Sequence, residues 1–219
     1  MKIDNKVFSV FWTVFLIVLV FSASSVLADQ RYLVGTGNFN DTAIWSATSG
    51  GTGGESVPGS NDDVILDANS SGFTVTLNVN ATIDSLTISD GTFDASTFFF
   101  TVLSRTDVSG GSLILGSGFR TFVGDLTLRG TGTLNCGSSN ITLRGNFTIS
   151  GGTFNAGTSL IRFNGGGGAI QTLGSALPIT LNNVTIDQAF PDNIGARVVF
   201  AATAGFATFT INGTLEMKY

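Results

Sequence analysis

The chain has 219 residues, a net charge of −5, no histidine and one cysteine. So few basic side chains argue against nucleic acid as a partner, because phosphates need neutralising cations. The missing histidine removes the commonest general base and the commonest zinc ligand, and a lone cysteine cannot form an internal disulfide. Glycine, threonine, asparagine and β-branched residues dominate after residue 28, which is typical of strands and turns rather than helices.

Residues 1–28 have the layout of a secretory signal peptide. Two lysines lie near its start, an apolar run covers residues 7–21, and Val26-Leu27-Ala28 ends it. The apolar run is shorter than the roughly 20 residues that a membrane-spanning helix needs. We therefore expect cleavage between Ala28 and Asp29, export of the remaining chain and no membrane contact afterwards. An uncleaved membrane anchor is the alternative interpretation.

Residues 29–70 precede an internal repeat and do not follow its pattern. The segment contains Trp45, a glycine-rich loop and the pair Val57-Pro58. The first turn of a repetitive β-structure exposes an apolar end and unpaired strand edges, so it needs a cap. We expect residues 29–70 to form this cap.

The same segment resembles an opening module of secreted bacterial and phage-associated β-helical proteins that are adhesin-like. The pattern reads Y-W-V-G-G-[ST]-G-N-W-x-D-x-x-H-W-S, then V-P, then D-x-V-x-F-D-A-N-S. The matching residues are Tyr32, Gly35, Gly37, Asn38, Asp41, Trp45, Ser46, Val57, Pro58, Asp63, Val64, Asp67, Ala68, Asn69 and Ser70. Leu33, Phe39 and Ile44 depart from the pattern.

A looser likeness connects the segment to the start of a G8 domain, a module linked to extracellular polysaccharide. Neither family has one defining activity. Together the two resemblances imply a secreted or cell-surface bacterial protein with an adhesive, structural or carbohydrate-handling function.

Residues 71–219 show a repeat of about twenty residues. A triplet of glycine, threonine or serine, and an apolar residue recurs in steps of 20, 21 and 20, beginning at Gly91, Gly111, Gly132 and Gly152. Short alternating segments supply three strands per repeat. The spacing predicts an all-β fold, a right-handed parallel β-helix (β-solenoid) whose inward residues stack in columns such as Phe93, Leu113, Leu134 and Phe154.

The pattern loosens over residues 164–205, which contain four successive glycines and two prolines. We expect rungs there that carry loops. A β-sandwich also has short strands and glycine-rich turns, but it gives no reason for a twenty-residue recurrence. Within the repeat, Cys136 aligns with small or apolar residues and is interpreted as a core space-filler. A further column, comprising Ser85, Asp107, Asp125 and Asn146, is predicted to form a structural polar ladder.

A polysaccharide-cleaving site would need two carboxyl groups a short distance apart. The candidate pairs are Asp90 with Asp94, and Asp107 with Asp125. Asp90 precedes a turn glycine, where aspartate commonly makes local hydrogen bonds, and the repeat stacks no second acid on Asp94. The sequence therefore predicts no catalytic centre, and enzymatic activity stays an open alternative.

Phe99, together with Asp90 and Asp94, is the candidate for a ligand surface. Strand alternation turns the two phenylalanine neighbours of Phe99 inward and Phe99 outward. An outward ring can stack on a sugar or contact a partner protein. Asp62, Asp63 and Asp67 offer oxygen atoms of the kind that calcium accepts, but their spacing matches no calcium loop. We expect no cofactor, with calcium as the alternative.

The first functional hypothesis is a non-catalytic extracellular structural or adhesive module. The alternatives are a carbohydrate-binding or polysaccharide-degrading β-helix, and the N-terminal fragment of a larger adhesin. Surface glycans or other proteins are the expected partners. No evident cap follows the last strand-like segment, residues 209–217, so end-to-end self-association is a further expectation.

Overall fold

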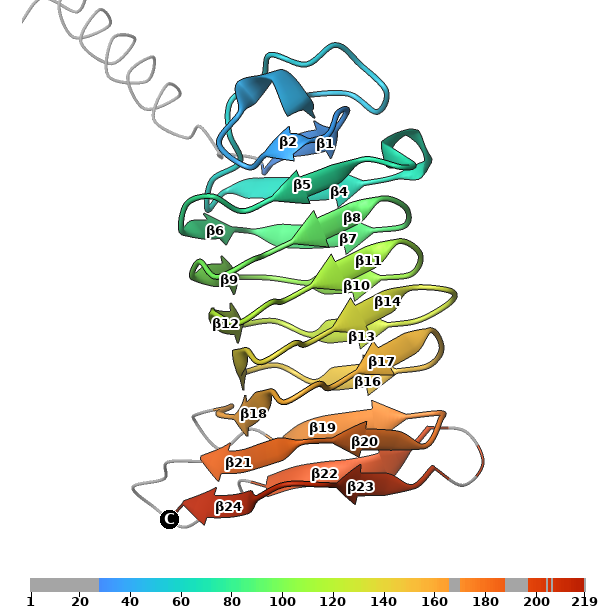
Figure 1. Ribbon diagram of the computed structural model, residues 1–219. Coiled ribbons are helices and arrows are strands. Elements are labelled where there is room, and N and C mark those ends of the chain that lie inside the picture. Colours follow the sequence, from blue (N-terminus) through green and yellow to red (C-terminus); the bar gives the residue numbers. More distant parts are fainter. Residues whose placement is uncertain (1–27, 166–169, 188–196, 204, 206, 219) are drawn as a thin grey trace, which may run out of the picture.

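The computed structural model describes residues 28–165, 170–187, 197–203, 205 and 207–218. This part of the chain is strand-rich, and its helical content is two 3₁₀ turns, η1 (Thr42–Ile44) and η2 (Ala68–Ser70). Its strands stack one above the other along one axis, and the stacked strands form long sheets (Figure 1). Residues 1–27, which carry nearly all of the predicted signal peptide, lie outside the described residues.

Three long sheets and one short sheet contain the strands. The first sheet has the spatial order β22 (Arg197–Ala202), β19 (Ile170–Ser175), β16 (Phe147–Ile149), β13 (Leu126–Leu128), β10 (Thr106–Val108), β7 (Ser85–Ile88), β4 (Asp62–Leu66), β1 (Asp29–Leu33) and β3 (Trp45–Ser46). The second has β17 (Thr153–Asn155), β14 (Thr133–Asn135), β11 (Ser112–Ile114), β8 (Thr92–Asp94), β5 (Thr74–Thr76) and β2 (Gly37–Asn38). The third has β24 (Leu215–Lys218), β21 (Asn183–Asp187), β18 (Leu160–Phe163), β15 (Asn140–Leu143), β12 (Phe119–Phe122), β9 (Phe100–Val102) and β6 (Ala81–Ile83). The short sheet pairs β20 (Ile179–Leu181) with β23 (Phe209–Ile211).

From β4 to β19 successive strands visit the three long sheets in turn, and from β7 onwards each of these strands pairs in parallel with a strand from the previous circuit. In the first sheet Leu86 pairs with Thr106, and Leu126 pairs with both Thr106 and Phe147. Only β1 with β3 is antiparallel among the described pairs. The prediction of an all-β chain with long parallel sheets is confirmed, and the arrangement is compatible with a β-solenoid. It excludes the antiparallel sandwich.

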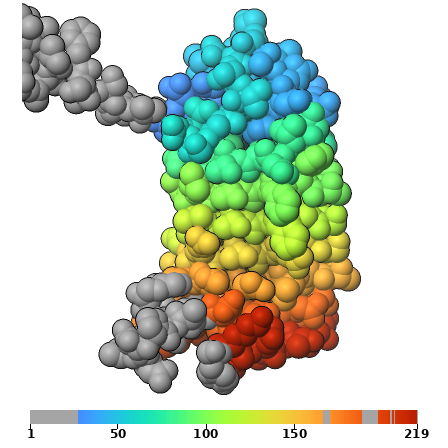
Figure 2. Space-filling model, turned by 90° about the vertical axis from the view of Figure 1, so that its left-hand side faces the viewer, coloured from blue at the N-terminus to red at the C-terminus, as the bar shows by residue number. Residues whose placement is uncertain are grey.

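Inward side chains stack into a continuous core. Phe93 pairs with Leu113, Leu113 with Leu134, and Leu134 with Phe154, so the predicted column exists. The first three are buried, while Phe154 is partly buried. Cys136 is also buried in this core, as the repeat predicts. In the space-filling view the body is a column in which bands follow the order of the sequence (Figure 2).

Left-handed residues make one of the corners between the second and third sheets. Gly116 has a φ of +66°, and a Cβ atom there would lie 1.9 Å from the carbonyl oxygen of Ser96 in the preceding rung. Ser96 itself has a φ of +50°, which is unusual for a residue with a side chain. The glycines of the repeat are thus needed where the backbone turns against its neighbour.

The N-terminal residues join the sheets earlier than expected. β1 pairs in parallel with β4, and β4 pairs in parallel with β7. Val64 and Leu66 of β4 alternate inward in the same way as the residues of later strands. Residues 29–70 therefore contribute strands to the long sheets in addition to the aromatic segment expected of a cap.

Trp45 anchors this aromatic segment. It is fully buried, and its indole Nε1 donates a hydrogen bond of 2.8 Å to the carbonyl oxygen of Phe39. The Phe39 ring meets Trp45 edge-on at 5.5 Å and Phe93 at 6.2 Å. Because Phe93 belongs to the core column of the repeat, these contacts connect the N-terminal segment directly to the core.

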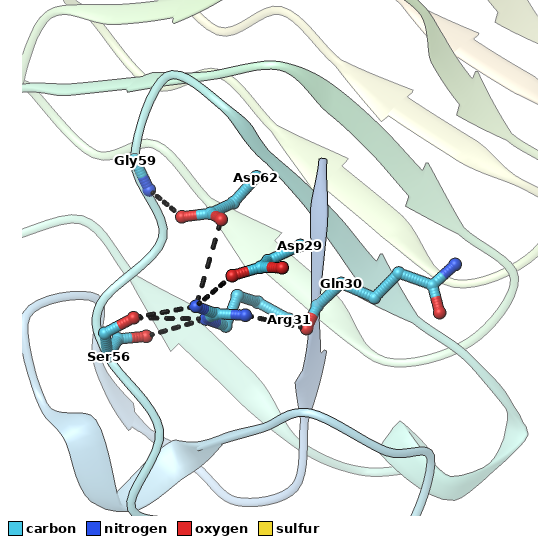
Figure 3. Close-up of polar contacts among 6 residues, drawn as sticks. All are labelled: Asp29, Gln30, Arg31, Ser56, Gly59 and Asp62. Atoms are coloured by element: carbon cyan, nitrogen blue, oxygen red, sulfur yellow. Dashed lines mark hydrogen bonds and ion pairs between the residues drawn. The ribbon is translucent and has the colours of Figure 1, made fainter. Parts of the chain in front are cut away.

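Arg31 of β1 connects this strand to the loop before β4 (Figure 3). Its guanidinium is nearly buried and donates hydrogen bonds to the hydroxyl of Ser56, at 2.8 Å from Nη2, and to the carbonyl oxygens of Ser56 and Gln30. The Asp29 and Asp62 carboxylates lie 3.4 and 3.9 Å from Nη2. The backbone N–H of Gly59 donates to Asp62, which completes the cluster. Three segments are thus tied together by one side chain.

Arg120 is a charged residue inside the core. It pairs with Phe100 and Ile141, both apolar, and is fully buried. Its guanidinium donates to the corner carbonyl oxygens of Leu115, Phe98, Ala95, Ser96 and Phe119. Burial lowers the pKa of Arg120 to about 10, and the charge of Asp94 opposes that shift. The side chain therefore stays protonated at neutral pH.

The next rung shows what Arg120 replaces. There the hydroxyl of Ser139 donates a hydrogen bond of 2.6 Å to the carbonyl oxygen of Cys136, which occupies the place of Leu115 one rung later. Gly118 occupies the place of Ser139 in the Arg120 rung, and it has no side chain to do this. A Cβ at Gly118 would lie 2.4 Å from Nη1 of Arg120. The Arg120 guanidinium thus donates to the corner carbonyl oxygen of Leu115, as the Ser139 hydroxyl donates to that of Cys136 in the neighbouring rung.

Candidate functional site

The outer face of the third sheet carries a pair of exposed aromatic rings. Phe99 immediately precedes β9, and Phe119 is the first residue of β12. Because Phe100 pairs with Arg120, the preceding residues Phe99 and Phe119 lie side by side. Their ring centroids are 5.4 Å apart with an angle of 13° between the planes, and each residue is 56% exposed. The outward position predicted for Phe99 is observed, whereas Phe100 is buried.

The backbone at Phe99 is fixed by the rung before it. Asn80 accepts a hydrogen bond of 3.0 Å from the Phe99 N–H through its side-chain oxygen. The N–H of Ala81 in turn donates to the carbonyl oxygen of Phe99 at 3.0 Å. Phe99 therefore presents its ring from a paired backbone, which makes the aromatic pair a preformed surface.

A shallow hollow adjoins the pair on the same face. It has a volume of about 190 Å³ and is lined by Phe119, Asn140, Ile141, Thr142, Leu160 and Arg162. Asn140 and Leu160 continue the column of Phe119, since Phe119 pairs with Asn140 and Asn140 with Leu160. The guanidinium of Arg162 lies 3.7 Å from the Asp187 carboxylate and is partly exposed. An aromatic face beside an amide, a hydroxyl and a guanidinium offers both stacking and hydrogen bonds.

Phe119 is a candidate that sequence reasoning missed. The residue stands twenty positions after Phe99, which is one step of the repeat. Applying the repeat to the outward position, as well as to the inward column, would have paired the two rings. The same step from Phe100 leads to Arg120 and would have revealed the charge in the core.

Asp90 and Asp94 each serve a local turn. Asp90 accepts a hydrogen bond of 2.7 Å from the N–H of Gly91, and Asp94 accepts one of 2.7 Å from the N–H of Ser96. The second bond supports the left-handed corner at Ser96. Two rungs later Asn135 does the same for Gly137, at 3.2 Å. The carboxylate of Asp94 thus has a structural counterpart in an amide, as expected of a turn residue.

The predicted polar column is wrong at one position. Leu86 pairs with Thr106, so the residue beside Ser85 is Arg105 and not Asp107. Asp107 lies two residues further along, and both of its oxygens accept hydrogen bonds from Arg129, at 2.9 and 2.8 Å. This hydrogen bond raises the pKa of Arg129. The error arose because Thr106-Asp107-Val108 has a polar residue where other rungs have leucine or phenylalanine.

The rest of that column does form a ladder. The N–H and side-chain amide of Asn146 donate to Asp125 at 2.8 and 3.2 Å, and the N–H of Thr172 donates to Asn146 at 2.9 Å. Earlier in the same column the hydroxyl of Ser85 donates to Asp63. Asp107 and Asp125, proposed as a carboxylate pair, therefore have separate partners.

The three candidate calcium ligands also have separate roles. Asp62 accepts from Gly59 and faces Arg31, and Asp67 begins η2 by accepting from the N–H of Asn69 at 2.9 Å. Asp63 accepts from Ser85. Within the described residues, no group of three or more acidic, histidine or cysteine side chains has the proximity needed to hold a metal ion.

Cys136 is shielded from solvent. Burial raises the pKa of its thiol to about 12. The thiolate, which is the nucleophilic form, is therefore scarce at neutral pH.

Comparison with known proteins gives no relative from which a role could be transferred: no family model, curated protein or solved structure matches the chain. In the described ranges no helix has the length and apolar character to cross a membrane.

Proposed function

We propose that the chain is a non-catalytic extracellular structural or adhesive module, folded as a right-handed β-solenoid with rungs of about twenty residues. The parallel pairing and the stacked core columns support the solenoid. The layout of residues 1–28 supports export to the outside of a bacterial cell or its surface. Residues 29–70 act as the N-terminal cap, and Trp45 and Arg31 supply its contacts with the first strands.

The observation that carries this proposal is the stacked pair of Phe99 and Phe119 on a paired backbone. Two large apolar rings more than half exposed are costly on the surface of a protein without a partner. The third sheet supports the two rings, because each of its strands, from β6 at one edge to β24 at the other, is paired with a neighbour. The aspartates that could perform hydrolysis are occupied with turns and ladders instead.

The distinction from an enzyme is tested by incubating the purified chain with a panel of polysaccharides and measuring new reducing ends. The proposal expects no release above that of a heat-denatured sample. Release that is lost in the variants Asp90→Asn or Asp94→Asn would overturn it, because those carboxylates would then act in catalysis.

A carbohydrate-binding role is the second candidate, and the hollow beside Phe119 favours it. A sugar ring can place its C–H face on the exposed phenylalanine while its hydroxyls reach Asn140, Thr142 and Arg162. The likeness of the N-terminal segment to modules linked with polysaccharide supports the same direction. A glycan array probed with the labelled chain tests it, and saturable binding to one glycan class is the expected result.

The proposal includes self-association through β22, β23 and β24, because the outer edges of these strands are available to pair with another strand. Among the described strands, β22, β23 and β24 stand last in their sheets, and Leu215 and Met217 of β24 are exposed. An edge of this kind can pair with another strand. Light scattering across a range of concentrations tests it: growth in mass with concentration supports end-to-end contact, and a constant monomer mass contradicts it.

A further inference from the structure

One wall of the column is interrupted between β17 and β20. In the first and third sheets the corresponding strands are continuous, because β16 pairs with β19 and β18 pairs with β21. In the second sheet β17 is the last strand, and β20 pairs with β23 alone among the described strands. Two strand edges therefore face each other without a ladder between them.

The interruption is visible in the burial of the core column. Phe93, Leu113 and Leu134 are buried at the middle position of β8, β11 and β14. Phe154 holds the same position in β17 and is partly exposed. The column is thus continuous up to the point where the next strand of this sheet is missing.

Backbone polar groups point into the interruption. In β17 the N–H of Thr153 donates to Gly132 and the carbonyl of Asn155 accepts from Cys136, so these residues face β14. Because hydrogen-bonding direction alternates along a strand, the N–H and C=O of Phe154 face the other way. In β20 the N–H of Ile179 donates to Thr208 and the carbonyl of Leu181 accepts from Asn212, so Thr180 faces β17 by the same rule.

A cavity of about 540 Å³ occupies the space between the two edges. Its apolar lining includes Ile149, Phe154, Ile179 and Leu181, and its polar side chains are those of Asn155, Thr180, Asn182 and Asn212. None of the described lining residues carries a charge. An ionic ligand would therefore be desolvated without a counter-charge, which is unfavourable.

We infer that the cavity between β17 and β20 is an acceptor for one extended, uncharged peptide strand supplied by another protein. Such a strand would pair with Phe154 on one side and Thr180 on the other, and it would place alternate apolar side chains against the core column. Main-chain hydrogen bonds provide affinity in this mode of recognition, and the pockets for alternate side chains provide specificity. Peptide fits better than a neutral sugar because the backbone donors and acceptors of two strand edges face the cavity, and a peptide strand can pair with both of them.

The probe for the test is an acetylated and amidated peptide with the sequence Gly-Thr-Phe-Asn-Ala-Gly, which copies residues 152–157 and is itself a strand of the second sheet. It is titrated into the isotope-labelled chain while amide NMR signals are followed. The expected result is a saturable shift of the Phe154 and Thr180 amide signals. A peptide N-methylated at its phenylalanine is the matched control and should bind about tenfold more weakly, since it lacks a main-chain donor.

Two protein variants make the test specific. Thr180→Pro removes the N–H that faces the cavity and should weaken binding about tenfold, whereas Thr180→Ala keeps that N–H and should bind the peptide like the parent. Equal binding of the N-methylated and unmodified peptides would overturn the inference even if Thr180→Pro failed to fold. It would also be overturned by a neutral oligosaccharide shifting the same signals in place of the peptide. Slow hydrogen exchange at the Phe154 amide in the free chain would overturn it too, because the edge would then already be paired.

Discussion

Phe99 and Phe119 stack with their ring centroids 5.4 Å apart on the outside of the third sheet, while their direct neighbours Phe100 and Arg120 pair on the inside. Strand alternation places the side chains of the two pairs on opposite faces of the sheet. The exposed rings can therefore be replaced without removing a core side chain. Arg120 also donates to the carbonyl oxygens of Phe98 and Phe119, so binding is tested by replacing the rings and stability by replacing Arg120.

Replacing Arg120 with isoleucine should destabilise the protein. The substitution introduces the residue found at position 141 of the next rung, but it leaves the corner carbonyl oxygens of Leu115 and Phe98 without the guanidinium donor. Unsatisfied buried acceptors cost about 1–3 kcal/mol each, partly offset by the removal of a buried charge. We expect the free energy of unfolding in urea to fall by about 2–4 kcal/mol.

The control for this experiment is Arg144→Met, which removes an exposed arginine. Its effect should be much smaller than that of Arg120→Ile, because surface substitutions away from a buried network change stability little. If Arg120→Ile unfolded at the same urea concentration as the parent, the proposed role of the guanidinium as a corner donor would be wrong.

Replacing Arg31 with methionine should loosen the N-terminal strand. The change keeps the length of the side chain but removes the hydrogen bonds to Ser56 and Gln30 and leaves Asp62 without a facing cation. We expect a loss of about 1–3 kcal/mol in the stability of this segment. Amide hydrogen exchange measures it: exchange in β1 and β4 should accelerate in Arg31→Met and stay unchanged in Arg144→Met, at an exposed arginine. Unchanged protection of β1 would contradict the account.

The thiol of Cys136 should be unreactive in the folded chain and should cause a loss of stability at alkaline pH. Its pKa is raised to about 12 in the folded state from an ordinary value of 9.0. The folded state therefore binds the proton more tightly, and this contribution to stability is complete below pH 9 and is lost as the pH rises from 9 towards 12.

Urea unfolding of the parent and of Cys136→Ala at several pH values measures this contribution. The parent should lose more stability than the variant between pH 9 and 11. A thiol reagent should label the parent quickly in denaturant and slowly without it. Fast labelling of the folded protein would show that Cys136 is accessible.

Much of the architecture follows from the sequence because strands stacked in parallel and in register repeat the environment of each residue. The step from Phe93 to Leu113 and Leu134 returns each residue to the same depth, so spacing alone predicts the core column and the parallel pairing. The outward column follows the same rule, since one step of the repeat leads from Phe99 to Phe119. The hydrophobic pattern does not predict Arg120 in the core, because a charged side chain can occupy a core position when backbone carbonyl oxygens accept its hydrogen bonds.

Other features depend on contacts between distant parts of the chain. Asp107 was placed in the wrong column because its rung has no apolar residue at the aligning position, and its partner Arg129 lies one rung later. The cavity beside Phe154 exists because β17 and β20 do not pair with each other. A fixed spacing of twenty residues cannot predict this, because the repeats become longer after residue 164. The cluster around Arg31 likewise joins residues 25 or more positions apart.

The most direct test of the proposed adhesive surface compares the parent with the double variant Phe99→Ser/Phe119→Ser on a glycan array and on immobilised cell-surface protein extracts. The control is Ile170→Ser, which removes an exposed apolar residue of similar accessibility from the first sheet. The account predicts that the double variant melts like the parent and loses binding by about tenfold or more, while Ile170→Ser keeps it. Unchanged binding by a folded double variant would show that the face carrying Phe99 and Phe119 is not the adhesive surface.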